Sequence, residues 1–343
     1  MARSRLLLAL ATAALLVPSA RGAGAADEVA KPRLTLCLAA AADGSPVYPL
    51  KEVPSNHREI AVVFQLRDDE TVKTMSHVWT AVDVGEAAPA GTVIAEGKLD
   101  VQGQHTGVLR FTLPRDLPVG KYTLEVKADD KAWSALELKV GEALKVTPVE
   151  KPADLLPLAV GTKWGYALVL EAGPIVKNVT LPGTEKGADG KLRGPVTFTA
   201  AAPDDHGTRV EMRRGGVVAN EEWWRLDATG LAVTKERQGT EEAEYDPPVY
   251  TIRLPLEAPS SWEHKSKDGS FQRSCRMWGP LPVAGPAGDV PGYVILSTQP
   301  TDRGAITIER HFAPGIGVVR EVHVQTAVGK LLTRLETTIV PVK

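Results

Sequence analysis

The sequence lacks the short motifs that mark most enzyme families. It contains no Cys-x-x-Cys pair, no Gly-x-Ser-x-Gly elbow, no His-Glu-x-x-His segment, no P-loop and no dinucleotide-binding fingerprint. Serine, histidine and aspartate are all present, but a catalytic triad is defined by geometry, which a sequence does not supply. We therefore expect no cofactor and no catalytic residue, and a hydrolase with a dispersed site is the least favoured alternative.

Cysteine is scarce, since Cys37 and Cys275 are the only two in 343 residues. In an oxidising compartment they could form a disulfide bridge, which would join two distant regions of the chain. The other interpretation is two buried thiols, one in an expected strand at 34–38 and one at 271–277. The sequence favours the buried thiols.

The chain has one long hydrophobic run, and it lies at the very start. Arg3 and Arg5 precede an apolar stretch from Leu6 to Val17, and Ala23-Gly24-Ala25 supplies the small residues of a cleavage site. This pattern is typical of a secretory signal peptide over residues 1–26, because about a dozen apolar residues are too few to span a bilayer. An uncleaved anchor is the alternative. We expect an exported protein, periplasmic or extracellular, with no membrane span in the mature chain.

An excess of basic charge is missing as well. The expected leader holds three of the 40 lysines and arginines and none of the 42 acidic residues, so the mature chain is slightly acidic. No basic patch indicates contact with nucleic acid or with an anionic membrane surface. The partners that remain are an apolar small molecule, a glycan or another envelope protein.

Long apolar stripes with helical spacing are absent, whereas 31 glycines and 26 prolines punctuate short segments rich in valine and threonine. This composition predicts a mostly β protein. In residues 30–141, seven short segments bounded by Gly, Pro, Asp or Asn recur, and the last two alternate apolar and polar residues most clearly. This pattern predicts an immunoglobulin-like β-sandwich with Trp79 in its core. Pro118-x-Gly120-x-Tyr122 is similar to the start of the penultimate strand in bacterial immunoglobulin-like modules. The seven strands are expected at 33–39, 59–66, 74–82, 92–99, 108–113, 121–127 and 132–140.

Residues 142–154 contain two prolines and mixed charges, which predicts a semi-extended linker. Residues 155–343 again show short strands joined by turns, which favours antiparallel pairing. We expect a second domain there, a curved antiparallel sheet or open β-barrel resembling half of a barrel. Its strands are expected at 164–170, 175–181, 196–200, 209–213, 217–226, 231–234, 293–297, 306–312, 318–325 and 331–340.

Several motifs of this second region follow an order found in one bacterial family. Pro157-Leu158-x-x-Gly161-x-x-Trp164-x-Tyr166 opens the region, Pro255-Leu256 precedes Trp262, and Ala313-Pro314-Gly315-Ile316-Gly317 comes near the end. Residues 155–340 thereby resemble the uncharacterised secreted or lipid-anchored bacterial domains labelled TapB-like, although Pro259 stands where the family often has glycine. The resemblance implies a curved antiparallel sheet similar to the open barrels of periplasmic lipoprotein carriers. It carries over no catalytic residue.

Aromatic residues of the second region are candidates for ligand binding. Neighbouring side chains of a strand point to opposite faces, so at most one of Trp223 and Trp224 can face a single core. Together with Trp164, Tyr166 and Trp262, the inward member could line a concave cavity for an apolar or sugar ligand. Aromatic packing, with contact to the first region, is the favoured alternative.

A weaker candidate is a metal site. Glu309 and His311 alternate along one expected strand, and Glu321 and His323 alternate along the next. If the hairpin register aligns these faces, two histidines and two carboxylates could bind zinc or a similar ion. The solvated face of a terminal hairpin is the favoured alternative, because such a face also shows polar residues at every second position.

These observations favour a non-enzymatic envelope or extracellular protein. The first region would act as a spacer or partner surface, and the second would bind an apolar ligand or an envelope partner. The alternative is a polysaccharide-binding protein that uses exposed tryptophans. A concave apolar cavity would favour an apolar ligand, and a flat row of exposed tryptophans would favour a glycan. A polar cleft with a histidine and a carboxylate in hydrogen-bond contact would favour an enzyme.

Overall fold

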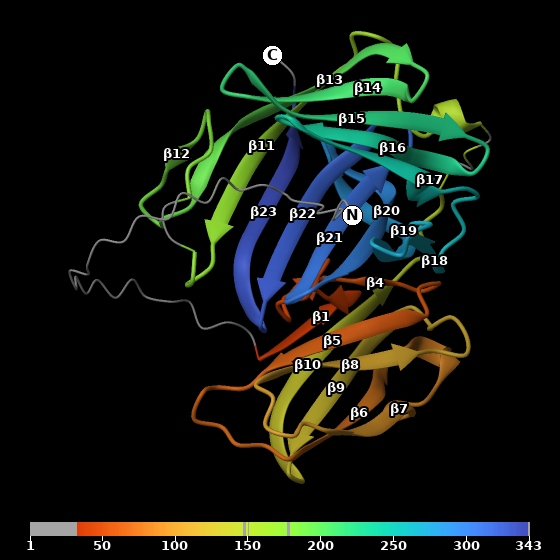
Figure 1. The fold of residues 1–343 in the computed structure, drawn as a ribbon. Helices are drawn as coiled ribbons and strands as arrows, with labels where there is room; N and C mark the ends of the chain where they lie inside the picture. Colours follow the sequence, from red (N-terminus) through yellow and green to blue (C-terminus); the bar gives the residue numbers. More distant parts are fainter. Residues whose placement is uncertain (1–32, 147–148, 150, 177–178, 342–343) are drawn as a thin grey trace. The chain divides into compact units, whose positions relative to one another are not determined.

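The computed structural model describes residues 33–146, 149, 151–176 and 179–341, and the chain divides into two compact units between Leu144 and Lys145 (Figure 1). The expected signal peptide lies outside these residues. The protein is mostly β. Besides the strands, the described residues form two short 3₁₀-helices, η1 (Gly85–Ala87) and η2 (Pro152–Asp154). No helix in the described ranges has the length and apolar character needed to cross a membrane.

The N-terminal unit consists of two sheets, with strand orders β1-β5-β8 and β4-β10-β9-β6-β7. All seven strands expected in this region are present. The immunoglobulin-like assignment of this sandwich stays a prediction. The strands of the two sheets are β1 (Leu34–Cys37), β5 (Glu59–Gln65) and β8 (Thr106–Thr112), and β4 (Val53–Pro54), β6 (Thr74–Asp83), β7 (Val93–Asp100), β9 (Gly120–Ala128) and β10 (Lys131–Gly141). A further short pair joins β2 (Ala39–Ala40) to β3 (Pro46–Val47).

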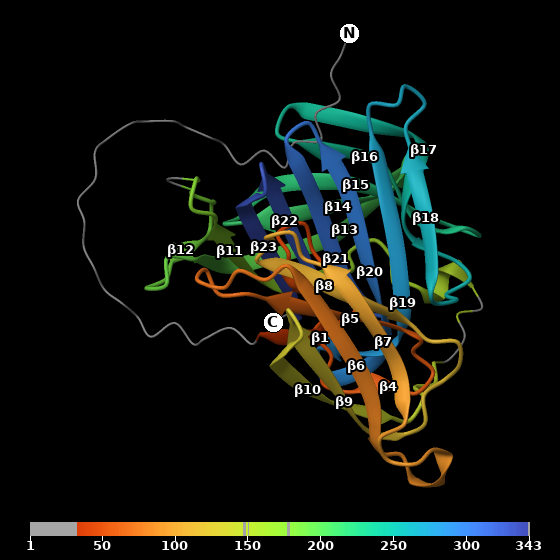
Figure 2. The same cartoon turned by 90° about the horizontal axis from the view of Figure 1, so that it is seen from below.

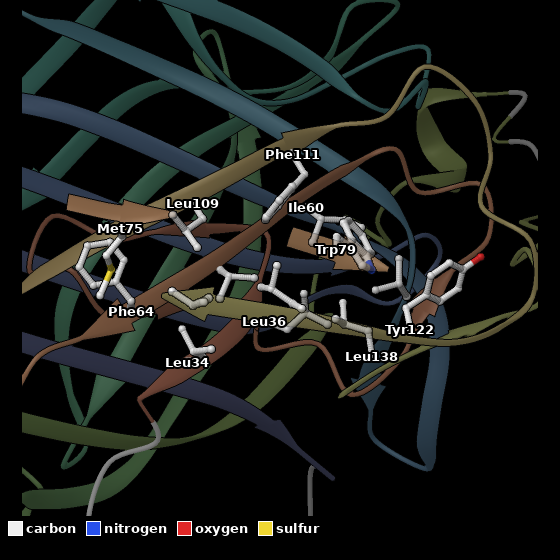
Figure 3. Close-up of a cluster of buried hydrophobic side chains, with 14 of the residues drawn as sticks. Leu34, Leu36, Ile60, Phe64, Met75, Trp79, Leu109, Phe111, Tyr122 and Leu138 are labelled. Atoms are coloured by element: carbon white, nitrogen blue, oxygen red, sulfur yellow. The ribbon is translucent and has the colours of Figure 1, made fainter. Parts of the chain in front are cut away.

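The core of this unit lies between its two sheets (Figure 3). Trp79 is 1% exposed, and the rings of Phe111 and Tyr122 meet it edge-on, with centroids 5.3 and 6.1 Å away. Tyr122 is also fully buried, and its hydroxyl donates to the carbonyl of Pro118 at 2.7 Å. Gly120 completes the motif, because a Cβ at that position would lie 2.2 Å from the carbonyl oxygen of Asp83. Trp79 is thus a packing residue, as expected.

The C-terminal unit is one antiparallel sheet that curls into a nearly closed barrel, in the order β17-β16-β15-β14-β13-β11-β23-β22-β21-β20-β19-β18. In Figure 1, strands β13–β17 arch over strands β20–β23. The strands are β11 (Lys163–Ala172), β13 (Leu192–Asp204), β14 (Gly207–Arg214), β15 (Val217–Asp227), β16 (Gly230–Gln238), β17 (Glu241–Arg253), β18 (Ser260–Lys265), β19 (Gln272–Gly285), β20 (Gly288–Thr301), β21 (Gly304–Ala313), β22 (Gly317–Ala327) and β23 (Lys330–Val340), and the short β12 (Glu185–Lys186) pairs with β13.

Strands β17 and β18 are the two ends of this sheet, and they lie beside each other (Figure 2). The indole Nε1 of Trp262 on β18 donates to the carbonyl of Tyr250 on β17 at 3.0 Å, which links the two ends. Register shifts at Trp223/Trp224 and at His311/Phe312 mark β-bulges. Bulges bend and twist a strand, and this bending allows a long sheet to curl back on itself.

Two expectations for this unit need correction. The strand expected at 175–181 is not formed in the part of that segment that the structure describes, and β11 pairs instead with β13 and β23. Pro174 and Pro182 flank the segment, and proline is a poor neighbour for a paired strand because it donates no hydrogen bond. The expected linker of residues 142–154 is also not extended free of the C-terminal unit along its whole length, since Val146 and Val149 pack against the core of that unit.

Candidate functional site

The curled sheet of the C-terminal unit encloses a cavity of about 190 Å³. Side chains alternate across each strand, so Trp164, Tyr166 and Leu168 of β11 all face this cavity, whereas Lys163 and Ala167 are exposed. Phe198 packs edge-on against Tyr166, with ring centroids 5.2 Å apart. One part of the cavity wall is therefore aromatic and aliphatic.

The polar atoms of the two β11 aromatic residues are occupied by backbone. Trp164 Nε1 donates to the carbonyl of Ile316 at 3.3 Å, and the Tyr166 hydroxyl donates to the carbonyl of Val318 at 2.6 Å. Gly317 between them has a φ of +105°, and a Cβ there would lie 2.3 Å from Leu156 Cδ1. Burial raises the pKa of Tyr166, so its hydroxyl stays a protonated donor. The rings are fixed in place and present apolar faces to the cavity.

The neighbouring tryptophans of β15 divide between two faces, as alternation predicts. Trp224 lines the cavity, with its ring centroid 6.3 Å from that of Trp164. Trp223 lies on the opposite face, where Nε1 donates to Asp204 Oδ2 at 2.6 Å and the Lys235 ammonium lies 5.0 Å from the ring. Trp223 therefore takes no part in the cavity.

Three of the five aromatic candidates, Trp164, Tyr166 and Trp224, come together around the cavity. Trp262 is buried in the same apolar cluster but connects the two ends of the sheet instead. No tryptophan within the described ranges is exposed. The flat row of exposed tryptophans that a polysaccharide-binding surface needs is thus not present in that part of the chain.

Part of the cavity wall is charged, a feature that the sequence analysis missed. Arg310 of β21 lies directly opposite Glu321 of β22, and Arg310 Nε donates to Glu321 Oε2. His323 Nε2 lies 2.5 Å from the other carboxylate oxygen, Oε1. Burial opposes the negative charge, but Arg310 and His323 outweigh it and hold the pKa of Glu321 below its usual range. Glu321 is therefore ionised inside the barrel.

A second acidic group faces the cavity from β15 and β16, where Glu222 and Glu236 are paired across the two strands. Trp224 Nε1 donates to Glu222 Oε2 at 2.7 Å, and the Tyr245 hydroxyl donates to Glu236 Oε2 at 2.9 Å. Burial, and then the charge of Glu236, raises the pKa of Glu222 to about 7. The charge on Glu222 consequently changes close to neutral pH.

Arg273 of β19 is 7% exposed and also faces the cavity. Its Nη2 donates to Gln299 Oε1 at 3.2 Å, whereas its Nε has no hydrogen-bond partner among the described residues. Burial lowers the pKa of Arg273, and the nearby charge of Arg310 lowers it further. One feature of the sequence could have indicated Arg310. It stands two residues from Ile308 and from Phe312 on β21, so alternation along the strand places it on the same face as these apolar side chains.

The hairpin register separates the two pairs of candidate metal ligands. Arg310 stands opposite Glu321 and Ile308 opposite His323, so Glu321 and His323 face the cavity while Glu309 and His311 share the other face. On that face His311 Nε2 lies 2.6 Å from Glu309 Oε1, and Arg320 Nη1 lies 3.1 Å from the same oxygen. The four candidates thus form two separate histidine–carboxylate contacts. Among the residues that the structure describes, no group of three or more His, Cys, Asp or Glu residues is placed to hold a metal ion.

Cys37 and Cys275 are both buried and both free, so the interpretation as buried thiols is confirmed and the bridge is not formed. Burial raises the pKa of Cys37 to about 11 and also raises that of Cys275, whose Sγ lies 3.3 Å from Ser297 Oγ. Because the thiolate is the reactive form, neither thiol is suited to nucleophilic chemistry.

No protein-family model matches the chain, and no curated protein matches it. Among solved structures it is similar to an inferred exported protein with a YmcC-like fold from Bacteroides fragilis, at 12% identity and a TM-score of 0.24. It is also similar to an inferred lipoprotein from Parabacteroides distasonis, at 14% identity and a TM-score of 0.24. Each similarity covers 54% of this chain and 96% of the other. At such TM-scores neither carries an argument about this protein, and the TapB-like resemblance stays a prediction.

Proposed function

We propose that this chain is an exported, non-enzymatic binding protein that takes up an apolar small molecule, or the apolar part of an envelope partner, inside its C-terminal unit. The signal-peptide pattern of residues 1–26 supports export. The N-terminal unit would serve as a spacer or as a surface for a partner.

The observation that carries this proposal is the wall built by Trp164, Tyr166 and Phe198. The hydrogen-bonding atoms of Trp164 and Tyr166 are already bonded to backbone carbonyls, so the rings offer a ligand apolar surface and no free donor. Cavities of this type, mostly apolar with a few placed polar groups, are the usual sites for small molecules.

Uptake of a neutral apolar dye, N-phenyl-1-naphthylamine, tests the proposal. We expect the dye to bind the full chain, and Ile308→Trp, which fills the cavity, to weaken binding by about tenfold or more. Val217→Trp is the matched control, because Val217 lies in the same unit and is 51% exposed. Binding is measured by fluorescence titration, and folding of each variant by circular dichroism.

If Ile308→Trp fails to fold, Val249→Phe places added volume at another cavity position. A wild-type chain that takes up no dye, or cavity variants that bind as well as the wild type, would refute the proposal.

A second candidate function, ester hydrolysis, is favoured by one observation. His323 and Glu321 form a histidine–carboxylate pair inside the cavity, and a carboxylate that orients a histidine is a common arrangement for a general base. We expect the binding function to prevail because Glu321 is also bound by Arg310. Turnover of 4-nitrophenyl decanoate by the wild type, lost in His323→Gln, would identify a hydrolase; a rate equal to that of buffer would support binding.

A further inference from the structure

The cavity holds more buried hydrogen-bond donors without partners than acceptors. Arg214 Nε, Arg273 Nε and Arg310 Nη1 are buried and have no partner among the described residues, and the matching acceptor there is Asn220 Oδ1 alone. A buried donor without a partner is unfavourable, and guanidinium groups form their strongest hydrogen bonds with anionic oxygens. The excess of donors points to a ligand that supplies acceptors.

Arg273 and Arg310 are the best placed of these donors. Each guanidinium already has one protein partner, Gln299 for Arg273 and Glu321 for Arg310, and each keeps a free nitrogen. Their charges are close enough for Arg310 to lower the pKa of Arg273, so an anion near both would relieve the repulsion between them. Arg273 is also deeply buried, so the partner of its Nε must be a group that enters the cavity.

The carboxylates that face the same cavity do not cancel this preference. Glu321 is neutralised by Arg310 and His323, and Glu236 accepts a hydrogen bond from Tyr245. Glu222, with a pKa raised to about 7, carries a proton for much of the time near neutral pH. Because Arg310 is paired with Glu321, the positive charges that remain are those of Arg214 and Arg273, against Glu236 and a Glu222 that is often protonated. One anionic group can offset this excess of positive charge.

The size of the cavity limits the ligand. A volume of about 190 Å³ accommodates on the order of ten non-hydrogen atoms, because covalently bonded atoms pack more closely than separate water molecules. The wall is apolar at Trp164, Tyr166 and Phe198 and charged at Arg273 and Arg310. These features fit a short molecule that is apolar along its length and charged at one end.

We propose that the cavity binds a medium-length, single-chain amphiphile with a terminal carboxylate, whose two oxygens are held by Arg273 Nε and Arg310 Nη1 while the chain packs against the aromatic wall. This inference rests on the proposed binding function and specifies its ligand. Arg273 and Arg310 would then decide which apolar molecules are preferred.

Calorimetric titration of the full chain with decanoate, decanol and decyltrimethylammonium tests the carboxylate site, since the three probes share one chain length. We expect decanoate to bind about tenfold more tightly than decanol, and Arg273→Gln to reduce that advantage to about twofold or less. Decanol should bind Arg273→Gln as well as it binds the wild type. Arg276→Gln, at an exposed position on the same strand, is the matched control and should keep the full advantage.

Arg310→Lys is a second variant, because lysine keeps a positive charge beside Glu321 and lacks the Nη1 donor. A smaller decanoate advantage in this variant supports the proposal. Equal affinities for decanoate and decanol, a preference for decyltrimethylammonium, or an advantage that survives in both arginine variants would overturn the carboxylate site while the binding function stands. Failure of the wild type to bind any of the three probes would overturn both.

Discussion

Replacing Arg310 by leucine is expected to lower the free energy of unfolding of the C-terminal unit by about 3 kcal/mol. The Arg310 side chain is 13% exposed and the Glu321 side chain 22%, so the ion pair between them is largely removed from water. Loss of the guanidinium leaves the Glu321 carboxylate inside the barrel, where His323 still lies within hydrogen-bond distance of it. Guanidinium unfolding followed by tryptophan fluorescence measures the change, since five of the seven tryptophans belong to this unit.

The double variant Arg310→Leu/Glu321→Leu separates an unpaired charge from lost packing. It should be markedly more stable than Arg310→Leu alone, because removing both charges also removes the unfavourable burial of a single one. Lys191→Leu is a suitable control: Lys191 pairs with Glu171 in the same unit, and both side chains are more than a third exposed, so the loss should be much smaller. A double variant as unstable as the single one would contradict the charge argument.

Replacing Glu222 by glutamine is expected to stabilise the protein at pH 8 and to have little effect at pH 5. The ordinary pKa of the glutamate is 4.5, and in the folded protein burial raises the pKa of Glu222 to about 7. Between pH 4.5 and pH 7 the folded protein therefore holds a proton on Glu222 that the unfolded chain has released. The stability that Glu222 contributes is fully present below pH 4.5 and is lost as the pH rises through 7. Glutamine stays neutral throughout, so we expect a gain of about 2 kcal/mol at pH 8.

Thermal unfolding at pH 5 and pH 8 measures this difference. Glutamine can still accept the hydrogen bond from Trp224 Nε1 but not the one from Asn220 Nδ2 at the same time. That loss is the same at both values of pH, so the difference between pH 5 and pH 8 isolates the charge. Glu236 on β16, Glu321 on β22 and Arg310 on β21 are the charged groups that act on Glu222, and none of them is altered. Glu263→Gln, an exposed position on β18, is the control and should show the same small effect at both values of pH. A gain at pH 5 as large as that at pH 8 would rule out the explanation.

The residues of β11 and β15 show how far alternation along a strand reaches. Trp223 and Trp224 were expected to divide between two faces, and they do. Trp164 and Tyr166, two residues apart, both face the cavity. The strand expected at 175–181 was wrong because alternation does not reveal which segment becomes the partner of β11. The partner of β11 on that side is β13, which pairs with it over eight residues.

The charged part of the cavity could not be derived in the same way. Arg273, Arg310 and Glu222 come from β19, β21 and β15, and their meeting depends on how the whole sheet curls. The four candidate metal ligands show the same limit, since a hairpin register that pairs Arg310 with Glu321 sends Glu309 and His311 to the opposite face. A shift of one residue in that register would have exchanged the two faces.

The amino-acid sequence by itself determined that this protein is built of strands, and that the neighbouring side chains of Trp223 and Trp224 stand on opposite faces. These properties are local, because they follow from a repeat of two residues along an extended backbone. Only the tertiary structure decided that the C-terminal sheet curls into a nearly closed barrel, that Trp262 joins its ends, and that Arg214, Arg273 and Arg310 face the cavity with unpaired donors. Those properties depend on bulges and on pairing between strands far apart in the chain, and no short stretch of sequence contains them.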